Sequence, residues 1–401
     1  MGDSIQRDGL IGAHGGLLIN RYAVGDQERL LREQIDGLAE VALTRRELAD
    51  LLLIAEGALS PLKGFQGAAA VAHVARHGRL DTGLAWTLPI TLQAKGSTAK
   101  VSEQVVLRDP TGEARGILSV SERFELDLEL IAKQVYGTRD PEHPGVAVLL
   151  GEDPQRLAGQ VMVFPAARAD RRRLSPGEVR SEISSRGWRD VAAFQTRNPL
   201  HRSHEYLLRI ALEVSDGLLL HPLVGETKAG DIPAEVRMRC YEALIDGYLP
   251  AKRVLLSVLD TAMRYAGPAE AIHHAILRQN YGASRFIVGR DHAGVGGYYG
   301  PFDAQARFDV YEPQELAIRP LKLDIAFWCQ RCGGIASPRT CSHDASERLS
   351  LSGSEVRRRL GSGEPLPESI TRPEVAAILR THYGPMESRT TPLREVQPKA
   401  A

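Results

Sequence analysis

The stretch that decides the fold lies between residues 195 and 205 and reads Gln195-Thr196-Arg197-Asn198-Pro199-Leu200-His201-Arg202-Ser203-His204-Glu205. An apolar run at 191–194 precedes it, and apolar residues recur at helical spacing over 202–214. Pro199 disfavours helix before itself and Gly217 ends the next element, so the pattern predicts a strand, a polar turn and a helix start. Unpaired backbone N–H groups at a helix N-terminus attract anions. The stretch therefore predicts an anion site.

Three side chains of this turn add hydrogen-bond donors, namely Arg197, His201 and His204. The two histidines are three residues apart, which places both imidazoles on one helix face, within reach of one bound group. A histidine pair at this spacing is more often structural or merely exposed. Here the pair follows an arginine at a helix start, and that combination suits the phosphates of a nucleotide.

From residue 191 onward, strand and helix patterns alternate. Strands are predicted near 191–195, 218–224, 253–259 and 285–289, with helices at 202–214, 233–247 and 268–280. This alternation predicts a doubly wound parallel sheet, whose ligands bind outside the carboxyl ends of the strands where the winding reverses, commonly between the first and fourth strands. The segments 195–198 and 289–294 follow those two strands. We therefore expect both to face one crevice.

The second of these segments is rich in glycine and reads Gly289-Arg290-Asp291-His292-Ala293-Gly294-Val295-Gly296-Gly297. Glycines let the backbone approach a ligand closely and present N–H groups to it. A flexible loop is the alternative, but the interleaved Arg, Asp and His favour binding. Neither a dinucleotide fingerprint after the first strand nor a Walker A sequence occurs, so a nucleotide has to be held in another way.

Composition narrows the class of protein. The 401 residues suffice for two or three domains, and Lys plus Arg equals Asp plus Glu at 50 each. Zero net charge gives no overall attraction to nucleic acid or to an anionic membrane, so a small substrate is expected. No apolar run approaches the roughly 20 residues that span a bilayer, and the N-terminus lacks a signal-peptide pattern. Four cysteines, three of them clustered, fit a reducing, cytoplasmic setting.

The first part of the chain, residues 1–168, alternates short apolar runs with turn signals and predicts a β-rich domain. The runs are 87–92, 101–107 and 116–120, and Asp109-Pro110-Thr111-Gly112 is a hairpin-type turn between two of them.

Two further segments carry predictions of their own, one within this domain and one at its end. Residues 43–57 predict an amphipathic helix that opens with a capping box of Thr44 and Glu47. The arginine-rich segment 167–176 predicts an exposed interdomain linker.

Polar residues near the other strand ends keep two interpretations. Lys228 could reach a phosphate, whereas Asp231 is better explained as a helix cap. Arg237 is either a ligand or a surface charge, and His273 and His274 are predicted to be ordinary helix residues.

Beyond the sheet, Cys329, Cys332, Cys341 and His343 form a C-x2-C-x8-C-x-H set. Two cysteines on a tight knuckle, with a nearby Cys and His, can give zinc its tetrahedral shell. The final C-x-H spacing is shorter than usual, which leaves the fourth ligand open. No open coordination position is expected, so the metal would be structural. Cys240 is predicted to be a small buried hydrophobe.

The stretch 195–205 resembles the Q-T-R-N-P-x-H-R-x-H-E signature of the ATP sulfurylase (sulfate adenylyltransferase) family, within the wider HxxH nucleotidyltransferase group. Other segments resemble that family in the same order: Ser60-Pro61-Leu62-Lys63-Gly64-Phe65, His143-Pro144-Gly145-Val146, Met263-Arg264-Tyr265-Ala266-Gly267-Pro268, Gly289 to Gly294, and Leu351-Ser352-Gly353-Ser354-Glu355-Val356-Arg357. Ordered agreement along nearly the whole chain is more specific than any single motif.

The resemblance implies an α/β protein in parts: a PUA-like β-rich domain at 1–168, a nucleotidyltransferase catalytic domain at 169–325, a C-terminal subdomain with the zinc knuckle at 326–390, and a disordered tail at 391–401. A homo-oligomer, with a dimer expected, is also implied.

The implied reaction converts ATP and sulfate into adenylyl sulfate and diphosphate by direct in-line attack of sulfate on the α-phosphorus, with Mg²⁺ on the phosphates. A sulfur-oxidising organism could use the same site to make ATP. Carried onto this sequence, the family's sulfate-binding residues are Gln195, Arg197 and Ala293. Its catalytic residues are Thr196, Arg197, Asn198, His201 and His204. Its ATP-binding residues are Gln195, Thr196, Arg197, Asn198, His201, His204, Gly289, Arg290, Asp291, His292 and Ile325. The structural Zn²⁺ would take Cys329, Cys332, Cys341 and His343.

Two other functions are compatible with parts of the pattern. One is another HxxH adenylyltransferase with an organic phosphate acceptor. The other is an RNA-binding protein that uses the β-rich domain and the zinc knuckle. Aromatic residues are few and no basic-aromatic stripe occurs, so no nucleic-acid partner is expected.

Overall fold

The computed structural model describes residues 9–168, 170–225, 232–351 and 353–383. The chain divides into two units, which are described separately. The first comprises Met1–Thr196, Ala211–Lys228 and Arg253–Leu323, and the second comprises Arg197–Ile210, Ala229–Lys252 and Asp324–Ala401. Lys228, Asp231, Ser352 and the tail expected at 391–401 lie outside the described residues.

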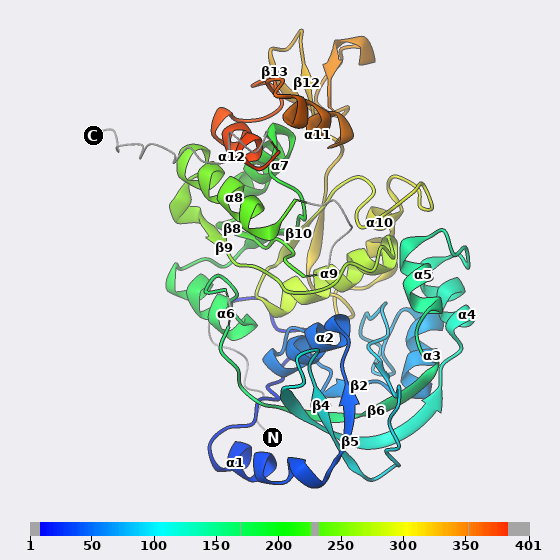
Figure 1. Cartoon of the computed structure of the whole chain (residues 1–401). Helices are drawn as coiled ribbons and strands as arrows, with labels where there is room; N and C mark the ends of the chain where they lie inside the picture. Colours follow the sequence, from blue (N-terminus) through cyan, green and yellow to red (C-terminus); the bar gives the residue numbers. More distant parts are fainter. Residues whose placement is uncertain (1–8, 169, 226–231, 352, 384–401) are drawn as a thin grey trace. The chain divides into compact units, whose positions relative to one another are not determined.

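The N-terminal part of the first unit contains a six-stranded sheet in the order β1-β4-β5-β6-β2, with β3 also paired to β6 (Figure 1). Its strands are β1 (Ala39–Ala42), β2 (Gly64–Phe65), β3 (Leu92–Gln93), β4 (Gln104–Arg108), β5 (Ala114–Glu125) and β6 (Gln155–Val163). Its helices are α1 (Asp26–Glu33), η1 (Ile35–Gly37), α2 (Arg45–Glu56), α3 (Ala68–His77), α4 (Leu128–Ile131), η2 (Ala132–Tyr136) and α5 (Pro144–Leu150). The β1–β4 pair is parallel and the other pairs are antiparallel. The prediction of a β-rich domain is confirmed.

Two local sequence patterns in this domain, the capping box and the apolar run at 87–92, had different outcomes. The capping box of α2 forms: Thr44 accepts a hydrogen bond from the Glu47 N–H, and the Glu47 carboxylate accepts one from the Thr44 N–H. The apolar run at 87–92 contributes little strand, because strand structure begins only at Leu92. Pro89 has no N–H to donate, and the N–H of Ile90 donates to the Gln66 side chain instead.

A five-stranded parallel sheet forms the rest of the first unit, in the order β11-β10-β7-β8-β9 (Figure 1). Its strands are β7 (Val191–Phe194), β8 (Gly217–Leu220), β9 (Val254–Leu256), β10 (Arg285–Val288) and β11 (Arg319–Lys322). Helices α6 (Pro176–Ser185), α9 (Pro268–Asn280), α10 (Asp303–Ala306) and η4 (Arg307–Val310) accompany them. Fully buried apolar runs form β7 and β8, as parallel strands covered on both faces require. The predicted order is confirmed: the first strand, β7, lies beside the fourth, β10.

The predicted linker is only partly exposed. Arg173 keeps 15% of its side chain accessible and lies 3.3 Å from the Glu56 carboxylate, which is 2% accessible. Treating the whole arginine-rich segment as surface was therefore wrong at Arg173. The sequence could not reveal this ion pair, because the two residues are 117 positions apart.

The second unit is mainly helical and carries a three-stranded sheet in the order β13-β12-β14. Its elements are α8 (Ala234–Tyr248), β12 (Phe327–Cys329), β13 (Gly334–Ala336), η5 (Ala345–Glu347), β14 (Arg348–Leu349), α11 (Gly353–Ser362) and α12 (Pro373–Tyr383). Helix α7 (Arg202–Glu213) begins in this unit, and η3 (Ala251–Arg253) precedes β9. Cys240 is fully buried in the cluster that α8 forms with α11 and α12, as predicted, and burial raises the pKa of its thiol to about 12.

Within the described residues, no helix is both long and apolar enough to cross a membrane.

Candidate functional site

The loops that follow β7 and β10 meet through a histidine of α9. The Gln195 Nε2 lies 2.9 Å from His274 Nδ1, and the same Nδ1 lies 3.3 Å from His292 Nε2. Because β7 and β10 are neighbours in the sheet, this contact lies where the winding direction reverses. The predicted convergence of the two segments is therefore present in the first unit at Gln195 and His292.

His274 was predicted to be an ordinary helix residue, and that interpretation was wrong. Its other ring nitrogen, Nε2, lies 3.4 Å from the Glu270 carboxylate, and its side chain is 1% accessible. Burial lowers the pKa of His274 and also lowers that of His292, to about 3, so both rings are neutral at pH 7. His274 thus links the two loops without adding a charge.

The Gln195 amide offers one unsatisfied atom, counted against the residues that the structure describes. Its Oε1 is buried and has no hydrogen-bond partner among the described residues. Which amide atom is oxygen and which is nitrogen is assigned from hydrogen bonding. Exchanging them would direct an N–H at this position, which is the group that an oxyanion needs.

The glycine-rich loop after β10 has a fixed and strained backbone. Two of its non-glycine residues have positive φ, Asp291 at 50° and Ala293 at 57°. The Asp291 N–H donates to Pro301 O at 2.8 Å, and Ala293 O accepts from the Gly267 N–H at 3.1 Å. Such strain persists only where surrounding contacts enforce it, and it is common in ligand-binding loops. This geometry favours binding over the flexible-loop alternative.

In the second unit, the first turn of α7 presents the two histidines of the signature. His204 Nδ1 accepts a hydrogen bond from the His201 backbone N–H at 3.2 Å, and His201 Nδ1 lies 2.8 Å from the Thr371 hydroxyl. Burial lowers the pKa of His201 to about 4. Burial and the neighbouring His201 lower the pKa of His204 to about 3. Both rings are neutral at pH 7, and because Nδ1 of His204 is an acceptor, its proton is on Nε2.

Buried charges hold this helix start in place. Glu205 is 4% accessible, and its carboxylate accepts from Arg372 at 2.8 and 2.9 Å and from Arg209 at 3.0 Å. Two-pronged guanidinium contacts of this kind restrict both distance and direction. Just before the helix, Asn198 O accepts from the Tyr241 hydroxyl at 2.7 Å. The signature turn is therefore rigidly supported by α8 and by the segment before α12.

Three other predicted site residues, Thr196, Arg290 and Ile325, take no part in the contacts described above. The Thr196 carbonyl accepts from the Leu223 N–H at 3.0 Å, and the Arg290 guanidinium lies 5.8 Å from the centre of the Phe302 ring. Ile325 is 47% accessible. Gln195 and the loop after β10 belong to the first unit, while Arg197, Asn198 and the two histidines belong to the second.

The four metal-ligand candidates converge. Their ligand atoms all lie within 4.8 Å of one another. His343 Nδ1 is 3.4 Å from Cys329 Sγ, 3.2 Å from Cys332 Sγ and 3.5 Å from Cys341 Sγ. Ligands about 2.0–2.3 Å from a tetrahedral zinc ion would be roughly 3.3–3.8 Å apart, so this spacing fits such an ion. The fourth ligand, left open by the sequence, is matched by His343, and the cluster could hold a metal ion.

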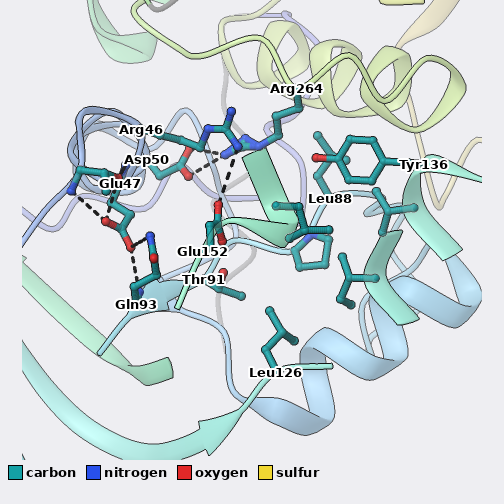
Figure 2. A pocket seen from close by; sticks show the side chains of 15 residues that line it. Arg46, Glu47, Asp50, Leu88, Thr91, Gln93, Leu126, Tyr136, Glu152 and Arg264 are labelled. Carbon is teal, nitrogen blue, oxygen red and sulfur yellow. Dashed lines mark hydrogen bonds and ion pairs between the residues drawn. The ribbon is translucent and has the colours of Figure 1, made fainter. Parts of the chain in front are cut away.

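A separate polar cavity in the first unit is lined mainly by the N-terminal part and by Arg264, and it contains none of the predicted site residues (Figure 2). Its volume is about 60 Å³. Nucleotide-sized ligands occupy cavities of roughly 300 Å³ or more, so this one is too small for ATP.

Comparison with known proteins gives consistent results. Residues 170–382 match the family model described as ATP-sulfurylase, and residues 11–166 match a PUA-like domain. A sulfate adenylyltransferase from Deinococcus radiodurans is 52% identical over 372 residues, covering 92% of this chain and 96% of that protein. One from Symbiobacterium thermophilum is 50% identical over 374 residues, covering 92% and 95%.

A solved structure with the same fold is the hexameric APS kinase from Thiobacillus denitrificans. It has a TM-score of 0.74 and 26% sequence identity, and the match covers 94% of this chain and 69% of that one.

Proposed function

Because this chain belongs to the ATP-sulfurylase family, we propose that it is a sulfate adenylyltransferase, which converts ATP and sulfate into adenylyl sulfate and diphosphate. The observation that carries the proposal is the meeting of Gln195 and His292 at the switch point of a sheet, in a chain that matches the family over its whole catalytic part. A crevice at this point of an open α/β sheet is where such folds bind nucleotides.

The proposed residue roles follow the family signature. Sulfate is bound by Gln195, Arg197 and Ala293. ATP is bound by residues 195–198, His201, His204, 289–292 and Ile325. The domain boundaries expected at residues 168, 325 and 390 are also part of this proposal.

Chemistry follows from the charges of the reactants. Sulfate is a dianion at neutral pH, so its attacking oxygen has no proton to lose, and direct attack on the α-phosphorus needs no general base. Thr196, Arg197 and Asn198 would stabilise the charge that develops at the phosphorus. The neutral rings of His201 and His204 support a donor role, because buried imidazoles with such low pKa values cannot serve as cations at pH 7. His204 would use its Nε2–H.

Magnesium would enter bound to the phosphates of ATP and would neutralise part of their charge. Asp291 is the single carboxylate in the proposed ATP-binding set. Mg²⁺ usually keeps several of its waters and is held largely by the phosphates of the nucleotide. The chain's own contribution is therefore expected to be positioning through Arg and His rather than direct coordination.

We propose that the metal at the Cys/His cluster is zinc, with a structural role, because four soft protein ligands leave no position for a substrate. We also propose a cytoplasmic homodimer. Three cysteines kept as metal ligands suit a reducing compartment.

The decisive assay measures diphosphate release from MgATP with and without sulfate. We expect release that depends on sulfate, with adenylyl sulfate as the second product, and the reverse reaction toward ATP when both products are supplied. Release that instead requires an organic phosphate acceptor would replace this proposal with the other HxxH chemistry. Tight, salt-dependent RNA binding with no release under either condition would overturn it.

A further inference from the structure

Residues 263–267, which lead into α9, contact the proposed sulfate loop. The Gly267 N–H donates to Ala293 O at 3.1 Å. Tyr265 and Gly267 both have positive φ, 59° and 49°, and a Cβ at Gly267 would lie 2.5 Å from the Tyr299 ring. A strained tyrosine and a glycine without space for a side chain need outside support to stay in this conformation.

One support comes from α9. The Glu270 carboxylate is 1% accessible and accepts from the Arg264 N–H at 2.8 Å and from the Ala266 N–H at 3.0 Å. Both N–H groups belong to the strained segment. This support lies within the catalytic part itself.

A second support comes from the N-terminal domain, at His143. Its Nδ1 accepts from the N–H groups of Gly145 and Val146 at 3.1 and 3.2 Å, at the start of α5. A neutral ring with Nδ1 as acceptor carries its proton on Nε2, and that atom lies 3.2 Å from the Tyr299 hydroxyl. Burial lowers the pKa of His143, which favours the neutral ring. The direction of this hydrogen bond is therefore fixed, from His143 to Tyr299.

The same chain of hydrogen bonds ends on the strained segment. The Tyr299 hydroxyl donates onward to Tyr265 O at 3.2 Å. The preceding residue of that loop, Tyr298, donates to the Asp140 carboxylate at 2.6 Å. Gly145 allows the close approach, because a Cβ there would lie 2.1 Å from Arg264 O.

A third support is the ion pair between Arg264 and Asp50 at the polar cavity, drawn with dashed lines in Figure 2. Arg264 is 6% accessible, and its Nη2 lies 2.8 and 2.6 Å from the two carboxylate oxygens of Asp50 on α2. A buried ion pair of this geometry positions its partners strongly, since removing either one leaves the other charge unpaired. The N-terminal domain thus acts on the segment 263–267 in two ways. Asp50 binds the Arg264 side chain, and His143 acts on the Tyr265 carbonyl through Tyr299.

We propose that the N-terminal domain positions the sulfate loop, with His143 and Asp50 as positioning residues that act through Tyr299 and Arg264 on Gly267 and so on Ala293. The inference rests on the proposed function, in which Ala293 binds sulfate. It explains why the segments around His143 and Arg264 resemble the family although neither carries a reacting group. The PUA-like domain then supports the sulfate site from outside it.

The test compares Tyr299→Phe with Tyr311→Phe. Tyr311 is 9% accessible, and its hydroxyl donates to Gly78 O at 3.0 Å, so the control also removes one hydroxyl that bonds to a carbonyl of the N-terminal domain. Tyr299→Phe removes both hydrogen bonds of the hydroxyl, the one from His143 and the one to Tyr265 O. We expect it to raise the KM for sulfate about three- to tenfold, with the KM for ATP changed less. Tyr311→Phe is expected to lower the melting temperature without altering either KM.

His143→Asn provides a second variant, should Tyr299→Phe fold poorly. Asparagine is a good helix cap and keeps the acceptor for α5, but it is too short to replace the Nε2 donor. It should repeat the selective rise in the KM for sulfate. Equal effects on both KM values, or the same effect in Tyr311→Phe, would overturn the inference.

Hydrogen exchange of the 289–297 peptide separates this inference from the proposed function. We expect faster exchange there in Tyr299→Phe than in wild type or Tyr311→Phe, whatever reaction the protein catalyses. Exchange in Tyr299→Phe that matches that of a wild type active with sulfate would refute the positioning role alone. Absence of sulfate-dependent release in the wild type would refute the function alone.

Discussion

The signature segment 195–204 and the Cys/His cluster at 329–343 both gather histidine with other polar groups, but the groups are arranged differently. In the cluster, four ligand atoms point at one another and lie within 4.8 Å, as an ion between them would require. In the signature, His201 and His204 are each fixed through Nδ1 by protein groups. Convergence indicates a structural metal, while rings oriented through Nδ1 by protein groups indicate donors with a fixed direction. The first region should therefore govern turnover and the second stability.

The largest expected effect tests the claim that the signature segment governs turnover. We predict that Arg197→Lys lowers turnover by about 10²–10³-fold or more, because an ammonium cannot reproduce the planar fork of a guanidinium against an oxyanion. The melting temperature should stay near that of wild type. Steady-state diphosphate release, with thermal unfolding in parallel, measures both. Arg202→Lys is a matched control, since Arg202 donates to Glu368 O on the protein itself, and retained turnover is expected there.

The next largest effect tests whether His204 acts as a hydrogen-bond donor. His204→Ala removes the donor and should cost about 10²-fold in turnover, with a smaller change in the KM for ATP. His204→Asn keeps an N–H and should retain more turnover than His204→Ala. Equal losses in two folded variants would mean that another property of imidazole matters, and the donor role would have to be abandoned.

The cluster should respond in the opposite way. We predict that Cys332→Ser loses the metal and lowers the melting temperature, while both KM values of the surviving enzyme stay near wild type. Elemental analysis should find one zinc per chain in the wild type and in the control variant Cys240→Ala, whose thiol is buried among apolar side chains. A folded, stable Cys332→Ser protein without turnover would contradict the structural role.

The smallest effect is the pH dependence. The folded pKa values of His201 and His204, about 4 and 3, lie below the usual 6.5. Between those values and 6.5 the unfolded chain binds more protons, so these histidines should make the free energy of unfolding fall as pH drops from about 6.5 toward 4. Turnover should show no histidine titration between pH 6 and 8. A bell-shaped profile centred near pH 7 would indicate an ionising imidazole.

The sequence predicted the parts of the fold that local pattern and chain topology determine. Helix α9 was predicted at 268–280 and forms there, and the neighbouring positions of β7 and β10 followed from the winding rule. The metal set was predicted from spacing, and its fourth ligand needed coordinates.

What the sequence missed depends on contacts between distant segments. Nearly every side chain of α9 is buried, so no periodicity distinguishes the face of His274 that meets the β7 loop. The sequence also offers no sign of the partner of Arg264, because Asp50 lies 214 residues away. For Arg264 a signal existed in the family resemblance of residues 263–268, but only the structure assigns a partner to each side chain.

The central claim is direct attack of sulfate on ATP by a site that supplies donors and no nucleophile. Exchange of labelled diphosphate into ATP tests it, because exchange requires the α-phosphorus to be transferred reversibly. The account predicts no exchange with MgATP and diphosphate alone, and exchange once sulfate is added. Exchange at a comparable rate without sulfate would demonstrate an adenylylated protein group and would contradict direct attack.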